Sequence, residues 1–430
     1  MNREAAPAGP ALRPLLVCTV LAAVVFTVVV GWLTPWQPLG AGAPPVHPDV
    51  RASFGEHQVA RAERFRDALG PWPYVALLLQ VLVPWGVVVA AARRVARGAD
   101  RTVRWRWPVL VAVVVAVALA QWLVAAPIAV HDHRVLRAFG LSTQGWAGWV
   151  RDQAVSWGIS TGAAVVGILL LFWLVRRLPR HWPYVAAGAA AALTVVGSAV
   201  YPVVVESAFN SVEPLPDGPL TASIHELAHR DGLGDVHVVV ADASRRTTGE
   251  NAHVSGLGAT RRVVIDDTVL DDAHSDPGVV LAIVAHELGH VEDQDVARGT
   301  AIGATGALAG VLALSLLLAT RRGRRVFTPG STRRAGVVRT GALVLAIAAT
   351  APYVVAPLTT TVSRRIEATA DVRALEATHD VPAFVRMQRD LAVSNLSNLT
   401  PAWWQTWWFS SHPSPPWRIA QARAWQQSRH

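Results

Sequence analysis

The sequence is poor in charged residues and in cysteine, and it contains no lysine. Only 16% of its 430 residues are charged and 52% are hydrophobic, whereas about 25% of residues are charged in an average soluble protein. This balance favours a protein that lies in a lipid bilayer. The single cysteine, Cys18, excludes an intramolecular disulfide. The net charge of +9 comes from arginines that flank apolar runs, so we expect no nucleic-acid partner.

Seven stretches are apolar and long enough to cross a bilayer as helices, which takes about 20 residues. They are approximately Leu15–Leu33, Tyr74–Ala92, Val109–Val130, Trp157–Val175, Tyr184–Val205, Thr300–Thr320 and Gly336–Leu358. None has an acidic residue in its interior, which disfavours a transporter or proton pump. The first stretch could be a cleaved signal peptide, but its apolar core exceeds the usual length of about 7 to 15 residues, so we favour a retained helix.

These spans divide the chain into four segments. We predict an N-terminal membrane domain with five spans, the first half of a soluble α+β domain, two further spans and the second half of that domain, at residues 1–205, 206–299, 300–358 and 359–430. In the first half, Val236–Val240 and Arg262–Ile265 are typical of short strands. In the second half, the prolines at 413, 415 and 416 predict an extended loop.

A metal-binding motif ends the first half of the soluble domain. The segment starts with Ser275-Asp-Pro, a helix-start pattern, continues apolar and ends in His286-Glu287-Leu-Gly-His290. Two histidines four residues apart share one helical face and can bind one zinc ion. Glu287 then lies beside the open position of the metal, where it can take a proton from a water that zinc polarises. The motif predicts metal-assisted hydrolysis with Glu287 as general base.

Catalytic zinc needs a third protein ligand. Just beyond the seventh span, a helical stretch contains Glu367, which we predict to be this ligand, and Asp371, placed one turn later to orient a ligating histidine. The alternative is an ordinary charged helix with pairs four residues apart.

The His-Glu-x-x-His pattern also occurs earlier, at His225, Glu226 and His229. This copy lies on a short stretch with one apolar stripe and stops at Arg230-Asp231-Gly232. We interpret it as a surface amphipathic helix; a second or regulatory metal site is the alternative.

Together these residues resemble the M48 family of membrane metallopeptidases, most closely the type I CAAX prenyl protease branch. That family has a zinc-binding His-Glu-x-x-His helix before its sixth membrane helix and an Arg-x-x-Glu-x-x-Ala-Asp segment after its seventh. The positions of this chain that match are His286, Glu287, His290, Arg364, Glu367, Ala370 and Asp371, with further matches at Asn251, Ala252, Asp295, His412 and Arg418.

The resemblance implies a mainly α fold, in which seven transmembrane helices form a bundle or barrel around a chamber. A zincin-like α+β metallopeptidase domain would be split around helices six and seven, with one Zn²⁺ per chain. Asn251 and Ala252 would lie on an edge strand that pairs with the substrate backbone. His412 would donate to the oxyanion, or else pack in its loop. Arg418 would brace that loop or an acidic neighbour, and Asp295 and Arg364 would support the site.

We therefore expect a multi-pass membrane zinc metalloendopeptidase (EC 3.4.24 type) that acts on membrane-associated peptides or proteins, in contact with lipid. Cleavage beside a prenylated cysteine is implied by the resemblance, but a broader substrate range is the safer expectation. The alternative is a catalytically silent scaffold, which a replaced Glu287 or ligand would favour, and none is replaced. The tryptophans at 403, 404, 407 and 408 are expected at the membrane interface, with a substrate groove as the alternative.

Arginines are most numerous in the loops between spans two and three, four and five, and six and seven. The positive-inside rule then places the N-terminus in the cytoplasm and the catalytic halves outside. Well-known members of the family are thought to face the cytosol, so the resemblance implies the opposite side. We follow the arginines because they are in this sequence.

Overall fold

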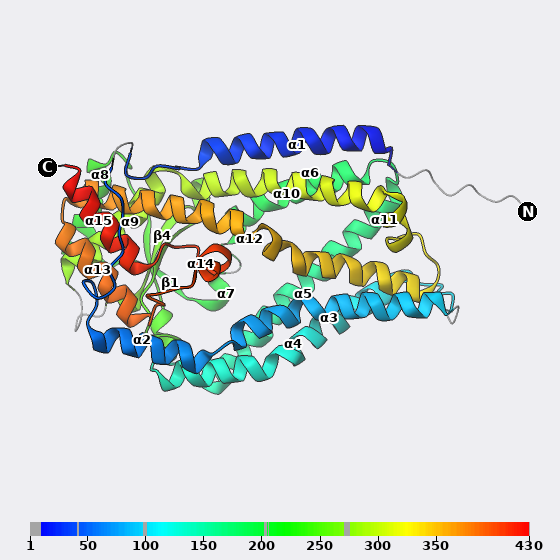
Figure 1. The fold of residues 1–430 in the computed structure, drawn as a ribbon, viewed down its shortest axis with the longest axis horizontal. Helices are drawn as coiled ribbons and strands as arrows, with labels where there is room; N and C mark the ends of the chain where they lie inside the picture. Colours follow the sequence, from blue (N-terminus) through cyan, green and yellow to red (C-terminus); the bar gives the residue numbers. More distant parts are fainter. Residues whose placement is uncertain are drawn as a thin grey trace, which may run out of the picture.

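The computed structural model describes residues 10–40, 43–97, 101–201, 204, 206–270 and 276–429. Val205, where the predicted fifth span ends, and Ser275, in the predicted helix start, lie outside these residues. Seven helices within them are long and apolar enough to cross a membrane. They are α1 (Leu12–Leu33), α3 (Trp72–Ala96), α4 (Arg106–Ala138), α5 (Trp146–Arg177), α6 (Trp182–Tyr201), α10 (Asp295–Ala319) and α12 (Arg334–Thr378). The predicted membrane bundle is therefore confirmed (Figure 1).

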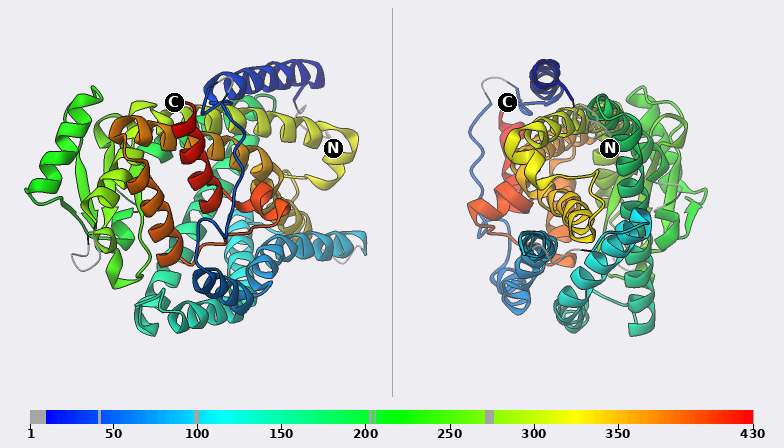
Figure 2. Two further views of the ribbon diagram at one scale, coloured as in Figure 1. Left: turned by 60° about the vertical axis from the view of Figure 1, so that its left-hand side comes forward. Right: turned by 90° about the vertical axis from the view of Figure 1, so that its right-hand side faces the viewer.

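Several of these helices are longer than a bilayer core requires. At about 1.5 Å per residue, the 45 residues of α12 extend roughly 68 Å, about twice the thickness of the hydrocarbon core. The helical stretch expected just beyond the seventh span is thus the continuation of the span itself. Seen along the long axis of the molecule, the membrane helices form a ring (Figure 2).

A small sheet lies beside one end of this ring. Its order is β1-β2-β4-β3, with β2 and β4 parallel and the other pairs antiparallel. The strands are β1 (Val212–Pro214), β2 (Val238–Ala241), β3 (Ala252–Ser255) and β4 (Arg262–Asp266). The two strands predicted from hydrophobic pattern correspond to β2 and β4. β3 is an edge strand of this sheet, because among the described residues it pairs with β4 alone.

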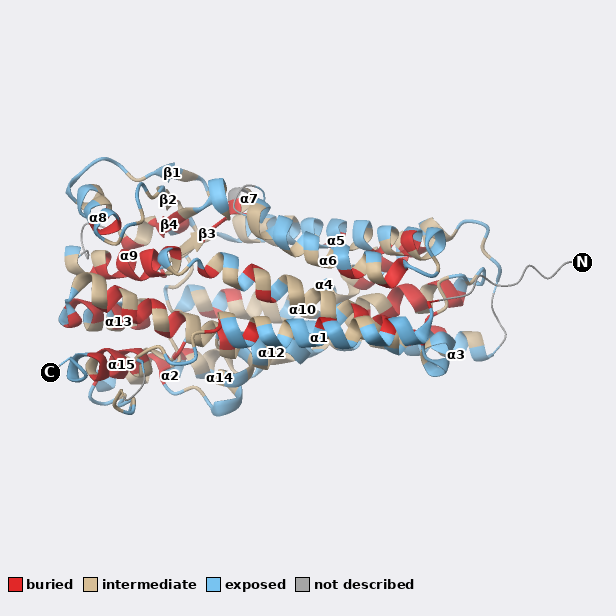
Figure 3. Ribbon diagram, turned by 90° about the horizontal axis from the view of Figure 1, so that it is seen from above, coloured by how far each residue is buried: buried red, intermediate tan, exposed pale blue. Residues whose placement is uncertain are grey.

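The remaining helices cluster at the same end as the sheet. They are α2 (Glu56–Leu69), α7 (Ser207–Phe209), α8 (Pro219–Arg230), α9 (Pro277–Glu292), α13 (Val381–Ser394), α14 (Trp403–Phe409) and α15 (Pro415–Gln427), whereas α11 (Arg321–Val326) lies at the opposite end. Buried residues are concentrated in α9, α13 and α15, while the spans expose long apolar surfaces (Figure 3). This contrast is expected when the spans face lipid and the other helices pack against one another.

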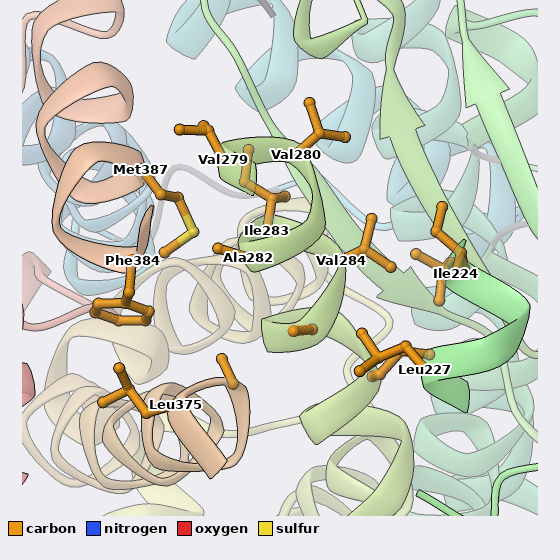
Figure 4. Packing of buried hydrophobic residues seen from close by; sticks show 14 of the residues in the cluster. Ile224, Leu227, Val279, Val280, Ala282, Ile283, Val284, Leu375, Phe384 and Met387 are labelled. Carbon is orange, nitrogen blue, oxygen red and sulfur yellow. The ribbon is translucent and has the colours of Figure 1, made fainter. Parts of the chain in front are cut away.

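Helix α9 is the centre of this packing. Val284 lies toward Ile224 and Leu227 of α8, and Ile283 toward Phe384 and Met387 of α13 (Figure 4). The five side chains other than Ile283 are at most 2% exposed, and burying a side chain of this size contributes about 1.5–3 kcal/mol. Contacts with α8 and α13 therefore fix α9 from both sides, and its C-terminal turns face α12.

The predicted proline loop is correct only at Pro413. Pro415 and Pro416 form the first turn of α15, where a missing backbone N–H costs nothing and the fixed φ favours a helix. The expectation of an extended loop there is wrong.

Candidate metal centre

Three of the predicted ligands meet where α9 and α12 cross. His286 and His290 project from one face of α9, and Glu367 projects from α12; each is at least half buried. Their ligand atoms all lie within 4.8 Å of one another, and no other group of three such residues was found in the described part of the chain.

The separations fit a tetrahedral metal ion. Nε2 of His286 lies 3.2 Å from Nε2 of His290 and 3.3 Å from Oε2 of Glu367. The other carboxylate oxygen, Oε1 of Glu367, lies 3.7 Å from Nε2 of His290. Ligand atoms about 2.0–2.1 Å from a tetrahedral zinc are about 3.3–3.4 Å from each other. Oε2 of Glu367 is buried and accepts no hydrogen bond, so a lone pair is free for a cation. The donor set could therefore hold zinc.

Each histidine has a carboxylate on its other ring nitrogen. Nδ1 of His286 lies 3.1 Å from Oδ1 of Asp371, and Nδ1 of His290 lies 2.9 Å from Oδ2 of Asp295. A carboxylate there keeps the proton on Nδ1 and leaves the Nε2 lone pair for a metal. Asp371 is itself fixed by Arg418, whose Nε donates to Oδ2 at 2.8 Å and whose Nη2 donates to Oδ1.

The charge balance of the site favours a cation. Burial lowers the pKa of His286, but the carboxylates of Asp371 and Glu367, whose oxygens lie 3.1 and 3.3 Å from its ring nitrogens, outweigh burial and raise this pKa to about 10. Burial likewise lowers the pKa of His290, but the hydrogen bond to Asp295 and the negative charges of Glu287 and Glu367 together outweigh it, and this pKa is raised. A pocket in which carboxylates stabilise positive charge this strongly is also suited to a divalent ion.

A glycine allows the two ligand-bearing helices to approach each other. A Cβ added at Gly289 of α9 would lie 2.8 Å from Cβ of Arg373 and 3.3 Å from the carbonyl oxygen of Ala370, both on α12. The glycine between the two histidines therefore sets how close Glu367 can come to their rings.

The centre opens onto a cavity of about 1560 Å³ inside the ring of spans. Glu287 is 5% exposed and lines this cavity together with both histidines and Glu367. His412 also lines it; its side chain is 58% exposed and its Nε2 lies 3.2 Å from Oε1 of Glu367. The proposed base and the proposed oxyanion donor thus face the same space as the metal ligands.

The other predicted residues lie around this core. Ala252 begins β3 and lines the cavity, while Asn251 directly precedes the strand and accepts a backbone hydrogen bond from Asp266. Arg364 lies one turn before Glu367 on α12 but bonds away from the metal ligands. Its guanidinium donates to the carbonyl oxygens of Thr406 and Ser410, in the segment that leads to His412.

The earlier His-Glu-x-x-His copy lies on α8, away from these ligands. Ile224 and Leu227 are buried, Glu226 and His229 are exposed, and His229 lies 3.6 Å from Asp235. This is the amphipathic arrangement expected from the sequence.

One cluster of polar side chains, centred on the buried Glu206, was not anticipated. Oε1 of Glu206 lies 3.0 Å from Nε2 of His253, and its Oε2 accepts hydrogen bonds from Ser255 and Arg262. Burial raises the pKa of Glu206, but its bonds to His253 and Arg262 outweigh burial and lower it to about 2. The cluster ties β3 and β4 to the segment that follows α6. The only sequence signal for it is an acidic residue soon after an apolar span.

Comparisons with known proteins agree with this architecture. Residues 214–426 match Peptidase family M48, and residues 75–211 match the CAAX prenyl protease N-terminal family of five membrane helices. The chain is 28% identical over 338 residues to the uncharacterized metalloprotease YhfN of Bacillus subtilis, covering 78% of each protein.

It is also 30% identical over 172 residues to CAAX prenyl protease 1 of Saccharomyces cerevisiae, covering 39% of this chain and 37% of the yeast protein. The crystal structure of S. mikatae Ste24p superposes with a TM-score of 0.67 at 19% identity, covering 96% of this chain and 100% of the other. That likeness supports the fold alone.

Proposed function

Because the chain belongs to peptidase family M48 and is a membrane metallopeptidase close to the CAAX prenyl proteases, we propose that it is a zinc-dependent endopeptidase. One zinc per chain would be held by His286, His290 and Glu367. The observation that carries this proposal is the convergence of these three side chains, at tetrahedral separations, on the wall of a cavity.

The proposed chemistry is hydrolysis of a peptide bond by water. Zinc would supply Lewis acidity, which polarises the substrate carbonyl and lowers the pKa of water. Glu287 takes a proton from the attacking water and returns it to the leaving amine. His412 donates to the carbonyl oxygen as negative charge develops on it. Asp371 and Asp295 hold the two histidine rings in the tautomer that presents Nε2.

The substrate would be an extended, membrane-associated peptide. The free edge of β3 borders the cavity, and an edge strand can pair with a peptide backbone without reading its sequence. The cavity walls contributed by the spans are mainly apolar, which suits segments drawn from the membrane. Prenylated CAAX sequences, to which the name of the yeast relative CAAX prenyl protease 1 refers, would be one case of this class.

A pair of glutamine variants tests the mechanism. Glu287→Gln should keep about one zinc per chain and lose peptide cleavage by a factor of about 10²–10⁴, because the general base is removed. Glu226→Gln is the matched control, since it changes the same residue of the exposed copy on α8. Activity that survives Glu287→Gln would exclude this mechanism. Zinc-loaded wild-type protein that cleaves no peptide would favour the silent scaffold.

We further propose that the catalytic end lies outside the cytoplasm. The arginine-rich loops and α11 lie at the end of the molecule opposite to α9 and the metal centre (Figure 1), and positively charged loops remain in the cytoplasm. With Cys18 replaced by serine, a cysteine introduced at the exposed Asp235 should react with an impermeant thiol reagent on intact cells. Protection of that position, with labelling at Arg322→Cys, would reverse the orientation.

A further inference from the structure

A second cavity lies between membrane helices, far from the metal centre. It has a volume of about 450 Å³ and is formed by α3, α4 and α12. Its lining is apolar except for one arginine: Val87, Pro108, Val109, Ala112, Val113, Ala116, Val117, Arg334 and Val338. We refer to these residues as the α4–α12 groove. An apolar crevice with one cationic end has the polarity of a binding site for an anionic amphiphile.

Two helix N-termini meet at the charged end of the groove. The segments before α4 and α12 pair with each other, because Val103 N donates to Thr332 O and Arg334 N donates to Arg101 O, both at 2.9 Å. The first turns of helices of 33 and 45 residues are thereby held together. Each N-terminus carries partial positive charge, which adds to the charge of the arginine.

The surrounding sequence is strongly basic. Residues 93–106 contain six arginines and one aspartate, and residues 321–339 contain seven arginines and no acidic residue. Some of these side chains are already engaged: Arg106 Nη1 donates to the carbonyl oxygen of Gly330, and Arg339 Nη2 donates to that of Arg325. Arg334, in contrast, is exposed, and its guanidinium makes no hydrogen bond or ion pair with the described part of the chain. It is available to bind an anion.

We propose that the α4–α12 groove binds an anionic phospholipid, with one acyl chain along the apolar lining and the phosphate at Arg334. Basic pockets between membrane helices favour lipids with acidic headgroups. A small inorganic anion would leave the apolar lining unfilled. A second copy of this chain, related by two-fold symmetry, would bring two arginine-rich ends together, which like charges oppose. An anionic phospholipid, in contrast, fills the apolar lining with its acyl chain and pairs its phosphate with Arg334.

The test measures lipid binding to the purified full-length protein. Protein stripped of lipid in a neutral detergent is titrated with phosphatidylglycerol or with phosphatidylcholine of the same chain length, and bound lipid is counted by native mass spectrometry. Wild type should retain about one phosphatidylglycerol at least ten times more tightly than phosphatidylcholine. Arg334→Gln should abolish this preference, because the phosphate loses its counter-charge.

Two further variants separate the groove from general basicity. Ala112→Trp should displace the acyl chain and weaken both lipids, whereas Arg322→Gln is the charge-matched control on α11, outside the groove, and should bind as wild type does. The proposal is overturned if phosphatidylcholine binds equally well, if Arg334→Gln and Arg322→Gln behave alike, if inorganic phosphate competes as effectively as the lipid, or if the groove instead joins two copies of the chain. None of these readouts depends on peptidase activity.

Discussion

Replacing Asp295 by asparagine should weaken zinc binding without unfolding the protein. Oδ2 of Asp295 lies 2.9 Å from Nδ1 of His290, while its Oδ1 is 3.2 Å from Nη1 of Arg298. Asparagine keeps the size of the side chain but removes the charge that makes the imidazole a stronger ligand. Arg298 retains Asp293 as a partner at 3.3 Å, so no charge is left unpaired.

The expected magnitude follows from these contacts. Loss of a carboxylate behind a ligating histidine weakens metal binding by about 10–100-fold, which corresponds to about 1.4–2.7 kcal/mol. Asp371→Asn should weaken zinc binding to the same extent, because Asp371 contacts the other ligating histidine, His286. It should also lower the free energy of unfolding. Asp371 is completely buried and pairs with the buried Arg418, and breaking a buried pair costs about 3–5 kcal/mol. The two variants should therefore differ in stability more than in affinity.

Zinc affinity is measured by competition with a chelating dye, and stability by thermal unfolding of the zinc-saturated protein. Asp293→Asn is the matched control, because the ion pairs of Asp293 are with Arg298 and Arg373 and not with either histidine. It should bind zinc as wild type does. If Asp295→Asn also binds zinc as tightly as this control, the carboxylate does not act through the ligand and the reasoning is wrong.

Two further predictions concern the surroundings of the site. Gly289→Ala should separate α9 from α12, because its Cβ would meet Cβ of Arg373 at 2.8 Å; overpacking of this kind costs about 1–3 kcal/mol, and chelator competition should show weaker zinc binding. Glu206 has its folded-state pKa lowered from 4.5 to about 2, so its stabilisation, at most about 3 kcal/mol, is complete above about pH 4.5 and is lost as pH falls towards 2. The difference in melting temperature between wild type and Glu206→Gln should accordingly shrink over that interval, and a constant difference would contradict the assigned pairing.

The sequence predicted the site best where residues with the required chemistry are close together in the chain, so that helix geometry alone places them side by side. His286 and His290 are four residues apart on an apolar helix, so their shared face follows from helical periodicity alone. The spans were equally clear because lipid requires long apolar helices. Glu367 is 77 residues beyond His290 in the chain, so no periodicity connects the two; its proximity had to be inferred from the need for a third ligand and from the family resemblance.

Features that depend on tertiary contacts could not be predicted in this way. The partners of Glu206 are 47, 49 and 56 residues away in sequence, and none belongs to a recognisable motif. β1 (Val212–Pro214) has only three residues, and β3 (Ala252–Ser255) lacks the run of branched apolar residues that indicated β2 and β4. Arg364 matched a family motif, yet it contacts the loop before His412 through backbone carbonyls, which carry no sequence signal.

The continuity of α12 connects the metal centre to the membrane bundle. Its first half packs with α3 and α4 through Ala342, Leu343 and Ala346, and its second half carries Glu367. Two prolines, Pro352 and Pro357, lie between these halves, and a proline inside a helix removes a hydrogen bond and permits a bend. A straight α12 would have to pack against the membrane helices and against α9 along a single axis. A helix that bends at its prolines can align each half with its own neighbours. The same segment that ends the membrane domain thereby determines where the third ligand meets the two histidines.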